Sequence, residues 1–229
     1  MIAYHGDPKQ KTKILAQLRR HAKADQLVKG QYWEAGKGCA VGCTIYSGNH
    51  AEYEPRFGIP RELAHLEDRI FERLDNGDSQ KWPIRFMSAI KPGADLSGVW
   101  PDFAVWLLTD PAAGVLRFAK ADRTRKSIQA VADLYTQRVW KGDARWSTAR
   151  TEARAACLTL LAADAARSAA AAARSAADDA PSAAADAAYA ADANAAAAAA
   201  AAARKRFWRT ASDKLLTLLA AAPLARSAA

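Results

Sequence analysis

The chain has 229 residues, about half of them apolar, and 33 lysines and arginines against 24 aspartates and glutamates give a net charge of +9. That length suits one domain of ordinary size with an extension, and no apolar run approaches the roughly 18 residues that a membrane span needs. With three cysteines and no apolar signal region, the composition predicts a cytoplasmic protein without a membrane partner or a disulfide framework.

The first predicted helix is strongly basic. Asp7 and Pro8 are a typical N-cap and first helical residue, and residues 8–30 hold seven lysines and arginines against one aspartate. A solvated basic face of this kind is common, but its charge would also attract nucleic acid, an anionic membrane surface or an acidic protein. The candidate residues for binding nucleic acid or another anion are Lys13, Arg19, Arg20 and Lys23.

Residues 31–53 form the segment that most resembles a functional site. Its central sequence is GKGCAVGC, in which Gly38 and Gly42 are four residues apart, as are Cys39 and Cys43. A helix that begins at Gly38 would place both glycines on one face, where a backbone can approach closely, and both cysteines on an adjacent face.

Three interpretations of these cysteines are open. Cys39 could be a thiol nucleophile, activated by Lys37 and a helix N-terminus, with His50 or His21 as its base. Cys39, Cys43 and His50 could bind a metal ion, or both cysteines could be small buried packing residues. Packing is favoured, so we expect no metal ion and no cofactor, and the catalytic candidates are Cys39 and His50.

The middle of the chain predicts further helices. Pro60 opens one whose apolar stripe is Leu63, Leu66, Ile70 and Leu74, with charged residues that include Glu67 and Glu72 expected on its other side. Others are expected near 82–90, 101–109 and 122–140, and short strands are allowed around 40–46 or 114–118. Five tryptophans between residues 82 and 146 are expected to fill a core.

The last third of the chain is rich in alanine. Between Ala162 and Arg206 there is no Leu, Ile, Val, Met, Phe or Trp, and Tyr189 is the only aromatic residue. Alanine favours helix without supplying an ordinary core. Pro181 would interrupt such a helix and predicts a hairpin turn. The amphipathic segment 207–222 is expected to dock on the body.

Together these patterns predict an all-α protein. A compact helical body at 1–146 would be followed by an Ala-rich helical hairpin extension at 147–206, and an amphipathic helix at 207–229 would pack back on the body. The favoured function is a soluble accessory interaction protein, with a protein partner or with self-association through the Ala-rich helices. The alternatives are a cysteine-dependent enzyme or small metal site centred on Cys39, and nucleic-acid binding through the basic 8–30 helix.

Several segments also carry a family resemblance: Tyr32–Thr44, Gly58–Pro60, Leu66–Glu72, Gly93–Leu96 and Ala211–Leu216. Together with the Ala-rich tail, they resemble a family of uncharacterised bacterial and bacteriophage proteins, over nearly the whole chain. Ser212 departs from the expected pattern, which has alanine there. The resemblance implies a bacterial or phage origin, and it implies no activity, cofactor, partner or site residue.

Overall fold

The computed structural model describes residues 1–158 and 200–225, and these residues are predominantly helical. Within them one sheet occurs, a pair of two-residue strands. The all-α prediction is therefore confirmed. The predicted hairpin turn at Pro181 lies outside the described residues, and the division at 1–146, 147–206 and 207–229 stays a prediction.

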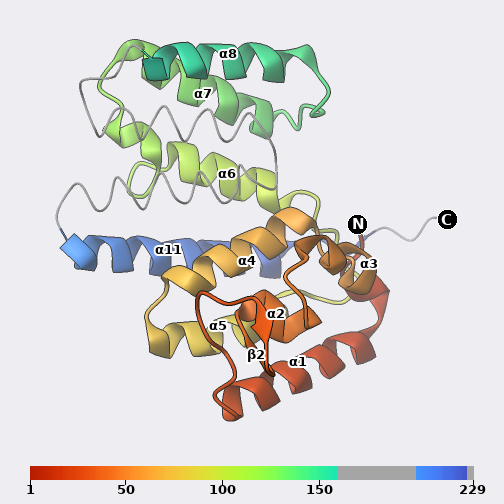
Figure 1. The fold of residues 1–229 in the computed structure, drawn as a ribbon. Helices are drawn as coiled ribbons and strands as arrows, with labels where there is room; N and C mark the ends of the chain where they lie inside the picture. The colour runs from red at the N-terminus through yellow and green to blue at the C-terminus, as the bar shows by residue number, and fades with distance from the viewer. Residues whose placement is uncertain (159–199, 226–229) are drawn as a thin grey trace. The chain divides into compact units, whose positions relative to one another are not determined.

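The chain divides into two compact units, Met1–Val99 with Ala211–Ala229, and Trp100–Thr210. The first unit contains η1 (Ala3–Gly6), α1 (Pro8–Lys23), β1 (Trp33–Glu34), β2 (Lys37–Gly38), α2 (Ala40–Ile45), η2 (His50–Glu52), α3 (Tyr53–Phe57), α4 (Arg61–Arg73) and α5 (Asn76–Ala89). In this unit α1 and α4 each pack against both α2 and α5 (Figure 1).

Local sequence explains where the helices of this unit begin. Asp7 caps α1, since its Oδ1 accepts a hydrogen bond of 2.8 Å from the Lys9 amide, and Pro8 occupies the first turn. The apolar stripe of α4 is buried as expected. The segment 40–46, allowed as a strand, is helix α2 instead, because Cys39 in an extended conformation starts a helical turn there.

A short extended segment, Gly93–Asp95, forms backbone hydrogen bonds to both the N-terminal and the C-terminal part of the first unit. The Ala3 amide donates to the Ala94 carbonyl at 2.9 Å, and the Gly93 amide donates back to the Ala3 carbonyl at 2.8 Å. On its other side, the Asp95 amide donates to the Pro223 carbonyl at 2.8 Å, and the Ala225 amide donates to the Gly93 carbonyl at 2.9 Å. Residues 223–225 are thus part of the first unit's hydrogen-bonded framework.

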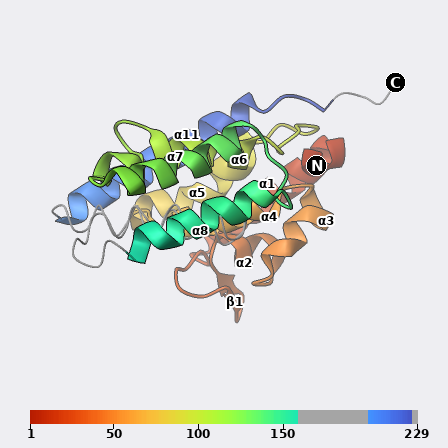
Figure 2. The same ribbon diagram turned by 90° about the horizontal axis from the view of Figure 1, so that it is seen from above.

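The second unit contains most of α6 (Val99–Thr109), then η3 (Val115–Phe118), α7 (Asp122–Thr136), α8 (Ala144–Leu158) and the first half of α11 (Ala200–Ala221). Helices α7 and α8 lie side by side (Figure 1, Figure 2). The segment 114–118, allowed as a strand, is mostly the 3-10 turn η3.

The aromatic side chains of the second unit form a contacting chain. The Tyr135 ring meets Trp100 and Trp146 edge to face, with centroids 5.8 Å and 5.0 Å apart. These contacts agree with the expected core role of the tryptophans. Trp140 departs from it, since 78% of its surface is exposed.

The C-terminal half of α11 belongs to the first unit. Leu215 and Leu219 are fully buried, and Trp208 in the preceding half is fully buried as well. Arg85 of α5 pairs with Asp213 at 3.0 Å. Over the described ranges, no helix combines the length and the apolar character that crossing a membrane requires.

Candidate functional site

The backbone around Cys39 is held by a tight hairpin and two glycines. Ala35 and Gly36, both with positive φ, turn the chain between β1 and β2. The hairpin brings the Tyr32 carbonyl against the start of α2, so a Cβ atom at Gly42 would lie 1.4 Å from the Tyr32 oxygen. At Gly38 the corresponding distance would be 2.0 Å, so the backbone approaches closely at both glycines, as expected. The helix considered to begin at Gly38 begins at Ala40 instead, and Gly38 lies in β2.

Cys39 caps α2 and is 1% exposed. Its amide donates to the Gln31 carbonyl at 2.7 Å, and its Sγ lies beside the Asp68 carboxylate, with the ligand atoms of the two residues within 4.8 Å. Burial, followed by the negative charge of Asp68, raises the pKa of the thiol far above its ordinary value, although amide groups at the start of α2 act in the opposite direction. A buried thiol that keeps its proton near pH 7 does not favour the nucleophile interpretation.

Cys43 faces a different environment. Its Sγ donates weak hydrogen bonds to the Gly38 carbonyl at 3.4 Å and the Gln26 carbonyl at 3.5 Å. Burial raises the pKa of this thiol to about 12. These contacts fit the packing interpretation for Cys43, and the metal set of Cys39, Cys43 and His50 does not assemble in the described residues.

Two carboxylates of α4 lie beside the Cys39 thiol. Asp68 and Glu72 are one helical turn apart, and ligand atoms of Cys39, Asp68 and Glu72 all lie within 4.8 Å of one another. Both Glu72 oxygens accept from the Gly30 amide at 3.0 Å. Burial raises the pKa of Glu72, with a contribution from Asp68, while the Gly30 hydrogen bond lowers it. We call Cys39, Asp68 and Glu72 the Cys39 cluster.

His50 approaches this cluster through Asp68. Its Nε2 lies 3.4 Å from Asp68 Oδ2, its side chain is 7% exposed, and its ring stacks on His65 at 4.1 Å between centroids. Burial, then His50 and Arg61, lowers the pKa of His65 to about 4, so its ring is neutral near pH 7. His65 is therefore half-buried against His50.

In the part of the chain that the structure describes, neither histidine considered as a base is hydrogen-bonded to the Cys39 thiol. Within the described ranges no hydrogen bond joins His50 to Cys39. His21 Nδ1 lies 2.6 Å from Gln26 Oε1, and its ring packs edge to face against Trp33 and Tyr46. The structure thus brings together Cys39, Asp68 and His50, without the direct thiol–imidazole contact of a nucleophile and its base.

Glu67 is a buried acid that the sequence pattern placed on the polar side of α4. It is fully buried, and its Oε2 accepts a hydrogen bond of 2.7 Å from the Tyr53 hydroxyl. Burial raises its pKa to about 8, although the Tyr53 bond lowers it and Asp68 adds a smaller rise. The prediction was wrong because residue 67 follows Leu63 by four and precedes Ile70 by three, which is the spacing of the apolar stripe itself.

A second candidate surface lies on α1. The exposed cations of this helix are Lys9, Lys13, Arg19, Arg20 and Lys23, which we call the α1 basic face. None of them has an ion pair or a side-chain hydrogen bond to any residue that the structure describes. The set contains all four residues predicted to bind an anion.

Two lysines of the 8–30 segment have structural roles instead. Lys11 Nζ donates to the carbonyls of Ser88 and Ile90, 2.7 Å from each, at the C-terminal end of α5. Lys29 Nζ donates to the Leu74 carbonyl at the end of α4. Cations stabilise helix C-termini, where carbonyl groups lack partners, so these two charges are not available to an external anion.

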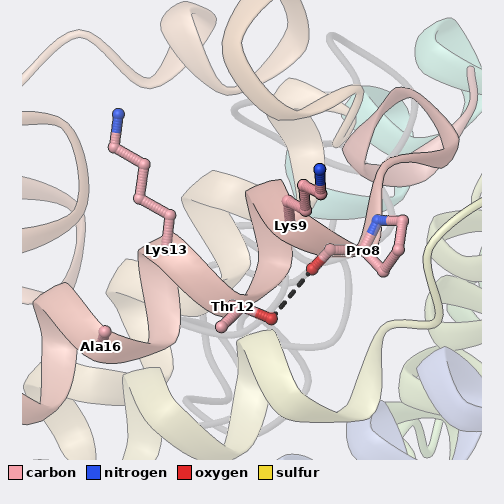
Figure 3. Close-up of a pocket in the computed structure, with 5 residues that line it drawn as sticks. All are labelled: Pro8, Lys9, Thr12, Lys13 and Ala16. Carbon is pink, nitrogen blue, oxygen red and sulfur yellow. Dashed lines mark hydrogen bonds between the residues drawn. The ribbon is translucent and has the colours of Figure 1, made fainter.

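The N-terminal part of the α1 basic face borders a surface groove of about 380 Å³. Its described lining is Pro8, Lys9, Thr12, Lys13 and Ala16, and the amino groups of Lys9 and Lys13 extend from the same side of the helix (Figure 3). The Thr12 hydroxyl donates to the Pro8 carbonyl at 3.0 Å. The groove therefore offers two ammonium groups beside small side chains.

The basic cluster at 117–126 differs from the α1 basic face in its contacts. Arg117 donates to the Ala112 carbonyl and lies over the Phe118 ring, 4.4 Å from its centroid. Arg123 Nη2 lies 3.7 Å from Glu152 Oε2. Much of this charge is engaged within the second unit.

No family model, curated protein or solved structure matches the chain. The resemblance to bacterial and bacteriophage proteins stays an expectation. The functional argument rests on the two surfaces described above.

Proposed function

We propose that the protein is an accessory interaction protein that binds the phosphate backbone of nucleic acid through the α1 basic face. The observation that supports this function best is a set of five exposed cations on a helix that contains no acidic residue. None of the five has a side-chain hydrogen bond or ion pair within the described part of the chain. Unpaired cations on one surface produce a local positive potential that attracts a polyanion.

The spacing of the cations suits several simultaneous phosphate contacts. Lys9, Lys13 and Arg20 are separated by four and seven residues, so they follow one line along the helix. From Lys9 to Lys23 the helix rises about 21 Å at 1.5 Å per residue, close to the axial length of about six base pairs.

The side chains between the cations favour nucleic acid over an anionic membrane surface. Helices that bind membranes insert bulky apolar side chains among the lipids. The apolar residues of α1, Ile14, Leu15 and Leu18, are buried inside the protein, and the exposed face has Thr12 and Ala16 between its cations. Phosphate contacts need no apolar insertion, so this face suits a phosphate backbone better.

Binding of this kind has little sequence preference. Arg19 and Arg20 can each form two parallel hydrogen bonds to a phosphate group, while the lysines act as point charges. Phosphate contacts set position and carry no base information. We therefore expect similar affinities for DNA fragments of unrelated sequence.

The test is fluorescence anisotropy with a labelled duplex DNA and a labelled RNA, titrated with the full chain at several salt concentrations between about 50 and 200 mM. The comparison variant is Lys13→Gln, Arg20→Gln, Lys23→Gln. Removing three phosphate contacts should lower the slope of log affinity against log salt by about 2.7 for duplex DNA, at roughly 0.9 per contact. Affinity at the lowest salt should fall by about tenfold or more.

A matched control removes the same charge elsewhere. Lys81→Gln, Lys120→Gln, Lys126→Gln changes three exposed lysines outside α1. This variant should keep most of the affinity and the salt slope. Equal losses in both variants would refute a role for this particular face, and so would an absence of wild-type binding at low salt. Binding to phosphatidylserine vesicles without binding to nucleic acid would replace the proposal with membrane attachment.

A further inference from the structure

The Cys39 cluster lies apart from the α1 basic face and has a chemistry of its own. A thiol from the start of α2 and two carboxylates from the middle of α4 bring their ligand atoms within 4.8 Å of one another. Such mixtures of sulfur and carboxylate oxygen are found around transition metals. We infer that Cys39, Asp68 and Glu72 bind one divalent metal ion of the zinc class.

An independent observation at Asp68 points to a missing ligand. The Asp68 side chain is 15% exposed, and its Oδ2 atom lies 3.4 Å from His50 Nε2. Its Oδ1 atom is buried and has no hydrogen-bond partner among the residues that the structure describes. Buried carboxylate oxygens nearly always have a donor or a cation beside them, because desolvating an unpaired acceptor is costly. A cation shared with Cys39 and Glu72 would satisfy Oδ1.

The donor set favours zinc over magnesium or calcium. Magnesium and calcium prefer sites made of oxygen alone, whereas a thiolate selects a softer metal. Three protein ligands leave a fourth position of a tetrahedral zinc ion to water. His50 can fix the orientation of the Asp68 carboxylate through their contact. Residues that hydrogen-bond to metal ligands commonly have this role.

Charge balance also favours a cation at this position. On binding, the Cys39 S–H bond breaks, its proton leaves to solvent, and the sulfur electron pair forms the bond to the metal, with no oxidation or reduction. The dication then offsets the thiolate and two carboxylates that otherwise repel one another.

The test uses the full chain freed of metal by a chelator and then titrated with zinc against a chromophoric competitor. We expect one zinc ion per chain, and substitution with cobalt should produce the charge-transfer absorption of a thiolate–cobalt bond. Asp68→Asn and Glu72→Gln should each weaken zinc binding by about 100-fold. This loss is at least as large as that from removing a residue that only hydrogen-bonds to a metal ligand. Cys39→Ser should remove the cobalt–thiolate band.

Two controls separate ligand loss from general damage. Cys43→Ser changes the neighbouring thiol, and Glu62→Gln changes a half-buried acid on the same helix. Both should keep zinc binding and the cobalt band. Far-ultraviolet circular dichroism checks folding, and Glu72→Gln, at a partly exposed position, provides the decisive result if Cys39→Ser does not fold. Absence of stoichiometric zinc in the wild type would overturn the inference, as would zinc binding that persists in folded Asp68→Asn and Glu72→Gln.

Discussion

Glu67→Gln should remove most of the pH dependence of stability between about pH 5 and pH 8. In the folded protein, burial raises the pKa of Glu67 from 4.5 to about 8. The folded state therefore keeps its proton over a pH range in which the unfolded chain has lost it. Stability contributed by this group is fully present below pH 4.5 and declines as the pH rises toward 8.

The size of the effect follows from the shift. Each pH unit in this window costs about 1.4 kcal/mol of unfolding free energy, so the full loss is of the order of 5 kcal/mol. Glutamine is neutral throughout and can still accept the hydrogen bond from Tyr53. The variant should therefore resemble the wild type near pH 5 and become the more stable protein near pH 8.

Urea denaturation followed by tryptophan fluorescence measures both proteins across this range. Other groups titrate in the same window, since a His65 with a lowered pKa adds stability as the pH rises from about 4 to 6.5. Their contributions cancel when the variant is subtracted from the wild type. Parallel pH curves for the two proteins would refute a neutral buried Glu67.

Two further predictions concern packing. Gly42→Ala should destabilise the fold by about 3 kcal/mol or more, because the new Cβ atom would collide with the Tyr32 carbonyl. The control is Gly77→Ala, where a Cβ atom would have no neighbour within 4 Å, and this variant should be neutral or stabilising by up to about 1 kcal/mol. Thermal melting compares the two, and equal melting temperatures would contradict the close approach. Leu219→Ala should cost about 2–5 kcal/mol in urea denaturation, since this side chain is fully buried, and a loss below about 1 kcal/mol would show that the end of α11 is not part of the core.

Much of the helical framework could be predicted from local sequence. The Asp7–Pro8 pair marks the start of α1 because both residues act within one helical turn. The apolar stripe of α4 is similarly local. Pro83 misled the prediction near residue 82, since it lies inside α5, a helix that already begins at Asn76.

The Cys39 cluster was only partly predictable. Cys39 and His50 stood out as reactive residue types, but Asp68 and Glu72 resemble the solvated charges of any surface helix. Their approach to Cys39 depends on how α2 packs against α4, which no short-range pattern contains. The spacing of four residues between Asp68 and Glu72 was the one sequence signal that both acids lie on the same face of α4. The burial of Glu67 could have been predicted, because its position has the spacing of the apolar stripe of that helix.

The place of Gly93–Asp95 in the first unit has a consequence for synthesis of the protein. When this segment leaves the ribosome its partner Ala3 is already present, but residues 223–225 on its other side are still untranslated. All of Trp100–Thr210 must be made in between, which takes roughly 5–20 seconds at bacterial or eukaryotic elongation rates. The second unit can therefore finish folding before the first. Until Leu215 and Leu219 are synthesised, the apolar surface of the first unit that they later cover stays exposed, and chaperones can bind to it.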